Sequence, residues 1–267
     1  MVASVSGPEA LSGMGRSGWH WLIGWWRMVH LGAQLLVLAL SPASYERAQR
    51  GVLARHLYLG TAPALPWFTV LSALLSLVVI RIVLVTALSY GLSQYALEMM
   101  VRVLVLELIP LIAALFAALR CTLPNGADIA ALRARGEWQA LAGRGIDPLR
   151  HEVLPRVAAG VFAVMMLAAV SCVLTLLLAY LSVYGFTLAG FAGYTRTVGH
   201  VFSPAVSMIF VLKILFFSFA VSLIPIASVL YDRPRSQSAM SAELQGLVRM
   251  FLVILLIEGI SLVGNYY

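Results

Sequence analysis

Long apolar runs dominate this sequence. The residues AVILMFWYC make up 61% of the 267 residues, and charged residues make up only 11%. A soluble domain of this length keeps a wet surface and cannot hide so much apolar area. Runs of about 18 or more apolar residues are typical of membrane-spanning helices. The sequence therefore predicts an all-α membrane protein whose five spans lie near residues 66–90, 97–119, 156–182, 201–230 and 245–264.

The N-terminal part differs from these spans. Residues 1–18 are rich in Ser and Gly and are predicted to be disordered, which leaves 19–267 as a single membrane domain. Residues 19–40 begin with four Trp, a residue type favoured at the headgroup level. We expect an interfacial or elbow helix there, with a full span as the competing interpretation. Residues 44–60 alternate basic and apolar residues and predict an amphipathic helix, so that 19–60 forms an interfacial region before Pro63 and Pro66.

The loops between the spans differ in their basic content. The 91–96 turn carries no basic residue and the 183–200 loop carries only Arg196. The basic residues gather instead in 120–156 (Arg120, Arg133, Arg135, Arg144, Arg150 and Arg156) and in 231–242 (Arg233 and Arg235). The positive-inside rule then places the N-terminus and both basic loops in the cytoplasm and the C-terminus on the other side. The net charge of +7 follows from this topology and does not indicate a nucleic-acid partner, because no recognition motif accompanies it.

Several ionisable residues interrupt the apolar runs. Each costs about 2.5–3.5 kcal/mol at the centre of a span, so such residues normally pair or face a cavity. Counting 1.5 Å per residue from the outer ends of four spans puts four of them about 9–15 Å deep: Arg81, Glu107, Lys213 and Glu258. Their formal charges sum to zero. Two interpretations stay open: a buried ion-pair network that fixes helix packing, or the polar wall of a substrate cavity. Arg102 lies nearer the surface, where it can extend to the outer interface or pair with Glu98.

The segment 120–155 is too patterned for a simple linker. Ile129, Leu132 and Trp138 lie at helical spacing within 128–138, and two glycines, Gly143 and Gly145, then break the pattern. We expect a short amphipathic helix between spans two and three, on the cytoplasmic side. Such a helix suits the docking of a soluble partner. The alternative is a helix that rests on the membrane surface.

The same region resembles the MlaE/YrbE family of ABC transporter permeases. The matching residues run without a gap from the second span into the third: Glu107-Leu108-Ile109-Pro110, Ala114-Leu115, Arg120, Ala127-Asp128, Leu141, Gly145-Ile146-Asp147-Pro148-Leu149-Arg150 and Pro155-Arg156. A looser resemblance covers about 20–265. The chain departs from the pattern at Ile109, Ala130 and the segment before the last span, which suggests a divergent member.

The resemblance implies a function and a set of partners. Such permeases form dimers in the bacterial inner membrane, with a second copy or a paralogue. They work with a cytoplasmic ABC ATPase, a periplasmic MCE protein and often a STAS-domain subunit, and together these move phospholipids or related lipids between the inner and outer membranes. ATP and Mg²⁺ would be bound by the ATPase, and no cofactor is expected in this chain, which has no Walker A motif.

The resemblance also implies roles for individual residues. Glu107, Lys213 and Glu258 match polar positions of the family's lipid cavity, and Arg81 joins them by the depth argument. The 120–155 loop corresponds to the coupling helix that docks on the ATPase, with these residues expected to contribute: Asp128, Arg133, Glu137, Trp138, Asp147 and Pro148.

Other classes of function find less support in the residues. An intramembrane enzyme would need a catalytic motif. His151-Glu152 is only a fragment of a zinc motif, and no G-x-S-x-G elbow is present. The main alternative to a permease is a non-transporting scaffold or a channel-like subunit. A channel is less favoured because the sequence shows no charged ring or filter-like repeat.

Overall fold

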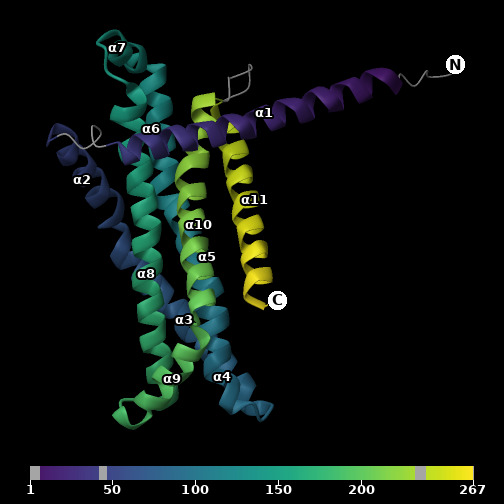
Figure 1. Cartoon of the computed structure of the whole chain (residues 1–267), viewed down its shortest axis with the longest axis vertical. Helices are drawn as coiled ribbons and strands as arrows, with labels where there is room; N and C mark the ends of the chain where they lie inside the picture. Colours follow the sequence, from purple (N-terminus) through teal and green to yellow (C-terminus); the bar gives the residue numbers. More distant parts are fainter. Residues whose placement is uncertain (1–6, 42–46, 232–238, 267) are drawn as a thin grey trace.

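The fold is an elongated bundle of long helices, seen in the computed structural model in Figure 1. The structure describes residues 7–41, 47–231 and 239–266; these are helical almost throughout, and none of them lies in a strand. Five described segments are long and apolar enough to cross a membrane: Gly51–Ser89, Tyr95–Ala134, Leu149–Tyr184, Pro204–Tyr231 and Leu244–Asn265. The predicted all-α class and the five spans are confirmed.

The first helix, α1 (Gly7–Leu40), lies across the end of the bundle and not along it (Figure 1). It packs on α10 (Pro204–Tyr231) and α8 (Leu154–Tyr184) through Met28, Leu31 and Leu35, while Trp26 and Val37 stay exposed. α1 is not among the described segments long and apolar enough to span a membrane, and its crosswise position is the one expected of an interfacial helix. The helix already begins at Gly7, so residues 7–18 are helical where disorder was expected. An apolar segment that packs on the bundle lets the helix extend toward the N-terminus despite the weak propensity of Ser and Gly.

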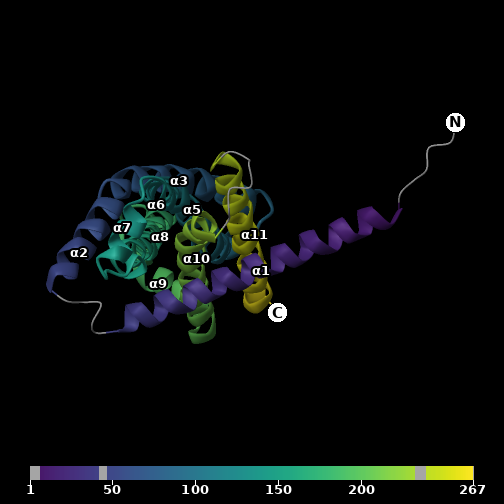
Figure 2. The ribbon, with the colours of Figure 1, turned by 90° about the horizontal axis from the view of Figure 1, so that it is seen from above.

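The first of these segments, Gly51–Ser89, consists of most of a tilted helix, α2 (Arg47–Thr61), and the whole of α3 (Ala64–Ser89). α2 packs along α8, and a turn at Ala62 and Pro63 leads into α3. Pro66 lies in the first turn of α3, as expected. Viewed from above, α2 lies on the side of the bundle away from α11 (Ala239–Tyr266), and α3 runs along one edge of the bundle from α2 toward α11 (Figure 2).

The second span contains two π-helical segments. It consists of α4 (Ser93–Met100), the π-helix η2 (Val101–Leu108), α5 (Ile109–Ala117), the π-helix η3 (Ala118–Thr122) and α6 (Leu123–Ala134). A third π-helix, η4 (Leu149–Val153), precedes α8. Each of these three described π segments ends two residues before a proline: Pro110, Pro124 and Pro155. Proline has no N–H to close an α-helical bond, so the local bonding shifts to the wider turn.

The predicted helix over 128–138 is interrupted. α6 ends at Ala134, and Gly136 takes a left-handed conformation (φ 74°) before α7 (Glu137–Gly143) begins. The periodicity of the apolar residues spans both helices, but only glycine takes a left-handed conformation routinely, and here it breaks the segment. We call this end of the bundle, with α6, α7 and residues 144–148, the loop end.

The opposite end carries the short helices η5 (Leu188–Gly190) and α9 (Phe191–Val201), which connect α8 to α10. Here Tyr194 is buried, and its hydroxyl donates a hydrogen bond to Leu176 O at 2.7 Å. Burial raises the pKa of Tyr194 to about 12. Residues 232–238, which include the basic Arg233 and Arg235, lie outside the described residues.

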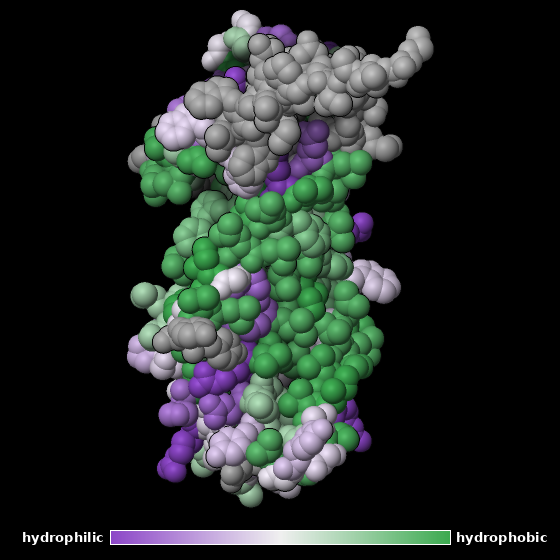
Figure 3. Space-filling model, turned by 90° about the vertical axis from the view of Figure 1, so that its right-hand side faces the viewer, coloured by the Kyte–Doolittle hydropathy of each residue, from purple (hydrophilic) through white to green (hydrophobic). Residues whose placement is uncertain are grey.

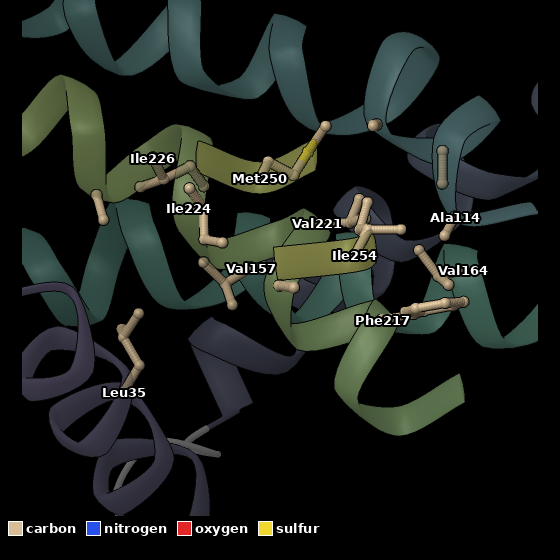
Figure 4. Close-up of a cluster of buried hydrophobic side chains, with 14 of the residues drawn as sticks. Leu35, Ala114, Val157, Val164, Phe217, Val221, Ile224, Ile226, Met250 and Ile254 are labelled. Atoms are coloured by element: carbon tan, nitrogen blue, oxygen red, sulfur yellow. The ribbon is translucent and has the colours of Figure 1, made fainter. Parts of the chain in front are cut away.

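Two large apolar cores and one small cluster, formed by Ala64, Cys121 and Ala163, fill the described part of the bundle. The larger one gathers side chains from α1, α5, α8, α10 and α11, among them Leu35, Ala114, Val164, Phe217 and Ile254 (Figure 4). The second lies toward the opposite end around Ile80, Met100 and Leu104. Buried hydroxyls link α3 to α8 through Ser72–Ser171 (3.0 Å) and Ser76–Thr175 (2.8 Å). The outer surface is largely apolar, but a strip of hydrophilic residues enters it on the side of α11 (Figure 3).

Candidate functional site

Three charged side chains from three helices meet in the interior. Lys213 of α10 forms ion pairs with Glu107 of η2 and, at 2.8 Å, with Glu258 of α11. Lys213 is 2% exposed and Glu107 9% exposed, so the group lies in an environment of low dielectric. Along α10, Lys213 lies between Phe210, which packs on the second core, and Ile214, which packs on the large core. Glu107 lies between Leu106 and Leu108 of the second core. We call these three residues together with Asn265 the ionic cluster.

The backbone near Pro110 explains why Lys213 fits here. An α-helix would bond the residue-110 N–H to Leu106 O, and a π-helix would bond it to Val105 O, but proline offers no N–H. Both carbonyl groups find other donors. Lys213 Nζ donates to Leu106 O at 3.2 Å, and Cys172 Sγ lies 3.7 Å from Val105 O. The Glu-Leu-x-Pro sequence thus creates an acceptor for lysine beside the carboxylate of Glu107.

Three oxygen atoms surround the ammonium group of Lys213. Its Nζ donates hydrogen bonds to Leu106 O and to Glu107, and Glu258 Oε2 lies 2.8 Å away as an ion-pair partner that accepts no hydrogen bond from the described residues. The Nζ atom also lies 5.8 Å from the centroid of the Phe217 ring, within cation–π range. Lys213 therefore holds the two carboxylates together in the interior. The cluster of one lysine and two glutamates carries a formal charge of −1.

Helix α11 contributes a polar stripe to the ionic cluster. Glu258, Ser261 and Asn265 recur at spacings of three and four residues and so share one helix face. Asn265 Nδ2 donates to Glu107 Oε1 at 3.1 Å, while Asn265 Oδ1 and Ser261 Oγ are buried without a hydrogen-bond partner in the described part of the chain. Sequence reasoning missed Asn265, although its position two turns after Glu258 signalled a shared face.

Arg81 does not join the ionic cluster. It is exposed, and no ion pair or hydrogen bond links it to the described residues. The buried face of α3 recurs every fourth residue at Phe68, Ser72, Ser76 and Ile80, so Arg81 projects about 100° away from that face. The depth estimate fixed its level but not its direction. The pair between Arg102 and Glu98 is present, with 3.0 Å between its atoms.

A comparison with known families identifies the protein class. A family profile described as Permease MlaE matches residues 53–263 of the 267-residue chain. The chain belongs to the MlaE permease family. It is thus a multi-pass membrane permease subunit of an ABC-type transporter and not a catalytic enzyme. The matched range includes Glu107, Lys213 and Glu258 and ends just before Asn265. No curated protein sequence gives a significant match.

The six expected coupling residues of this MlaE-family chain fall into two groups. Asp128 and Glu137 are exposed at the loop end, and Glu137 pairs with Arg135 at 3.0 Å. The other four also contact the chain itself. Trp138 packs on the large core, Asp147 Oδ1 accepts a hydrogen bond from Leu149 N at 3.0 Å, Pro148 precedes η4 as its N-cap, and Arg133 reaches α10.

Arg133 connects the loop end of the MlaE-family chain to the lysine helix. Its Nη1 donates to Val229 O at 2.9 Å and to Leu230 O at 2.8 Å, at the end of α10. These carbonyls belong to the last turn, where a cation is favourable. On the same interface, a Cβ at Gly126 would lie 3.9 Å from Pro225 O. A displacement of α6 therefore acts directly on α10, the helix that carries Lys213.

Proposed function

We propose that this permease moves phospholipid between the inner and outer membranes of a bacterium, as the membrane-spanning part of a larger complex. The observation that carries the proposal is the ionic cluster, which places three charged groups in the interior of a bundle of membrane-spanning helices. Burying such groups is costly, so they normally mark a substrate path or a packing constraint. Membership of the MlaE family favours the substrate path.

The headgroup would meet the ionic cluster from the side of α11. Ser261 Oγ and Asn265 Oδ1 have unused hydrogen-bonding capacity, and the cluster carries a formal charge of −1. A headgroup with N–H or O–H donors would satisfy these atoms without breaking the bonds of Lys213. Acyl chains would lie against the exposed apolar residues of α3 and α11, such as Leu74, Val78, Leu255 and Val263.

Movement of the lipid would be driven from the loop end. An ABC ATPase subunit would dock around Asp128 and Glu137, with Trp138, Asp147 and Pro148 holding the shape of the loop. Its closure would displace α6, and the Arg133 bonds to Val229 and Leu230 would pass this displacement to α10. A shift of Lys213 relative to Glu107 and Glu258 would then change the site that the headgroup occupies.

The remaining partners follow from the same proposal. The loop end and the N-terminus would lie in the cytoplasm and the C-terminus in the periplasm, where an MCE protein would receive the lipid. A STAS-domain subunit would join the ATPase. A second copy or a paralogue would cover part of the apolar surface that α3 and α11 expose. ATP and Mg²⁺ would be bound by the ATPase.

Purification of the tagged chain from native membranes in a mild detergent tests the proposal. Mass spectrometry of the co-purified proteins and lipids should find an ABC ATPase, an MCE protein and phospholipid. A Glu258→Gln variant should keep the proteins and lose lipid, whereas Glu98→Gln, in the half-exposed pair with Arg102, should keep both. Recovery of the chain alone in every detergent would contradict the proposal and favour a non-transporting scaffold.

A further inference from the structure

A separate cavity lies at the loop end of the bundle. It has a volume of about 230 Å³ and opens between α2, the start of α3, α6 and α8. Its polar lining comes from His56, Arg120, Cys121 and Asn125. Arg120 follows Glu107 on the same continuous helical span, about 20 Å farther along the axis at 1.5 Å per residue. The cavity is thus remote from the ionic cluster.

Two polar residues of the lining, His56 and Arg120, can donate hydrogen bonds to an anion, and Arg120 is positively charged. Arg120 is exposed at the cavity, and the charges of Arg55 and Arg156 act on His56. Arg156 pairs with Glu152, but its Nε atom is buried and has no hydrogen-bond partner in the part of the chain that the structure describes. Asp128 is the other acidic residue that acts on His56. Among the residues that line the cavity, the charged side chain is that of Arg120, so the cavity favours an anion.

The backbone adds donors to the same cavity. Helix α3 begins at Ala64, which is 1% exposed, and its N-cap is Pro63, with no side-chain cap; both residues line the cavity. The first N–H groups of a helix have no intrahelical partner, and the helix dipole favours negative charge there. Next to them, Thr61 is 4% exposed and its Oγ1 has no hydrogen-bond partner among the described residues.

The wall of the cavity is apolar where it meets the outside of the bundle. Leu59 lines it and is exposed, and Leu119, next to Arg120, is exposed as well. A free inorganic anion would gain nothing from these side chains. An anionic amphiphile would place its charged group among the donors and its chains along the leucines, which are adjacent to the apolar surface of the spans.

We propose that this cavity binds the phosphate group of an anionic phospholipid, drawn from the membrane leaflet at the loop end. Arg120 and His56 contact the phosphate from the side, and the start of α3 faces it with its N–H groups. The site is distinct from the ionic cluster in position and in charge. The proposal does not depend on which substrate the permease transports, because it concerns only binding at the loop end.

Native mass spectrometry of the purified full-length chain in detergent tests this site. Dioleoyl phosphatidylglycerol is titrated against dioleoylglycerol, which has the same chains and no phosphate. The wild type should retain one tightly bound phosphatidylglycerol and release dioleoylglycerol. Arg120→Gln should weaken phosphatidylglycerol binding about tenfold or more, as expected for a lost charge-assisted hydrogen bond, and His56→Gln should weaken it less because it removes an ordinary hydrogen bond. Thermal melting of each variant shows that it remains folded.

Two further arms separate the sources of binding. Arg144→Gln removes the same charge from an exposed position of the loop that does not line the cavity, and should leave binding unchanged. An equal loss of phosphatidylglycerol binding in Arg144→Gln and Arg120→Gln would overturn the proposed site, because general surface charge would then explain the binding. Inorganic phosphate at millimolar concentration should not displace the lipid. Full displacement by phosphate would overturn the assignment to a lipid.

Discussion

Replacement of Lys213 by methionine should destabilise the protein strongly, because the side chain has three partners and 2% exposure. The variant keeps the length of the side chain but leaves Glu107 and Glu258 facing each other without a cation. Removing one member of a buried ion pair costs about 3–5 kcal/mol. The Leu106 carbonyl, which lacks its α-helical donor because residue 110 is proline, also loses the Lys213 donor at about 1–3 kcal/mol. We therefore expect a loss of at least about 3 kcal/mol.

Unfolding in detergent, followed by circular dichroism, measures this loss. Arg102→Met is the matched control, since it breaks an ion pair with Glu98 whose side chains are 29% and 31% exposed. Such a pair is worth about 0–1 kcal/mol. Adding Glu258→Gln to Lys213→Met should restore part of the stability, because only one buried carboxylate then remains. Equal losses in Lys213→Met and Arg102→Met would refute the energetic role given to the ionic cluster.

Other substitutions test separate parts of the account. Pro110→Ala supplies the missing N–H, so thermal melting should show equal or higher stability, while ATP-dependent lipid transfer should fall. A fall in both stability and transfer would contradict the role given to the Val105 and Leu106 carbonyls. Arg133→Gln should cost about 1 kcal/mol in the same unfolding assay and lower ATP-driven transfer with ATPase binding retained, while Arg144→Gln changes neither. Burial raises the pKa of Tyr194 from 10.0 to about 12. The buried neutral phenol therefore contributes fully to the stability of the folded protein below about pH 10, and this contribution is lost as the pH rises through about 12. Tyr194→Phe should remove this step from the tyrosinate absorbance titration, and its persistence would contradict the burial of that phenol.

The spans and the depth of the charges follow from the sequence for a simple reason. Helices rise by a fixed amount per residue, so Glu107, Lys213 and Glu258 could be placed at one level before any contact was known. Their convergence depends also on the direction of each side chain. For Arg81 that direction is outward, and the sequence offered only the four-residue repeat of Phe68, Ser72, Ser76 and Ile80 as a hint.

Local irregularities limited the rest of the prediction. A regular helical wheel fails at η2 and η3, where the π-helical turn before Pro110 and Pro124 changes the angle between successive residues. The sequence did not predict the break at Gly136, because the apolar residues on either side of it continue the same helical spacing. The contacts of Arg133 with Val229 and Leu230 join segments about a hundred residues apart, so the local residue pattern around Arg133 could not predict them.

ATP-driven phospholipid transfer by the purified complex in proteoliposomes is the most direct test of the proposed function. Labelled phospholipid should leave the permease-containing vesicles only when ATP is present and the partner subunits are bound. Glu258→Gln should lower the rate with the complex intact, because the carboxylate faces the proposed headgroup site, and Glu98→Gln should not. Transfer that is absent from the intact wild-type complex, or unaffected by Glu258→Gln, would contradict the account.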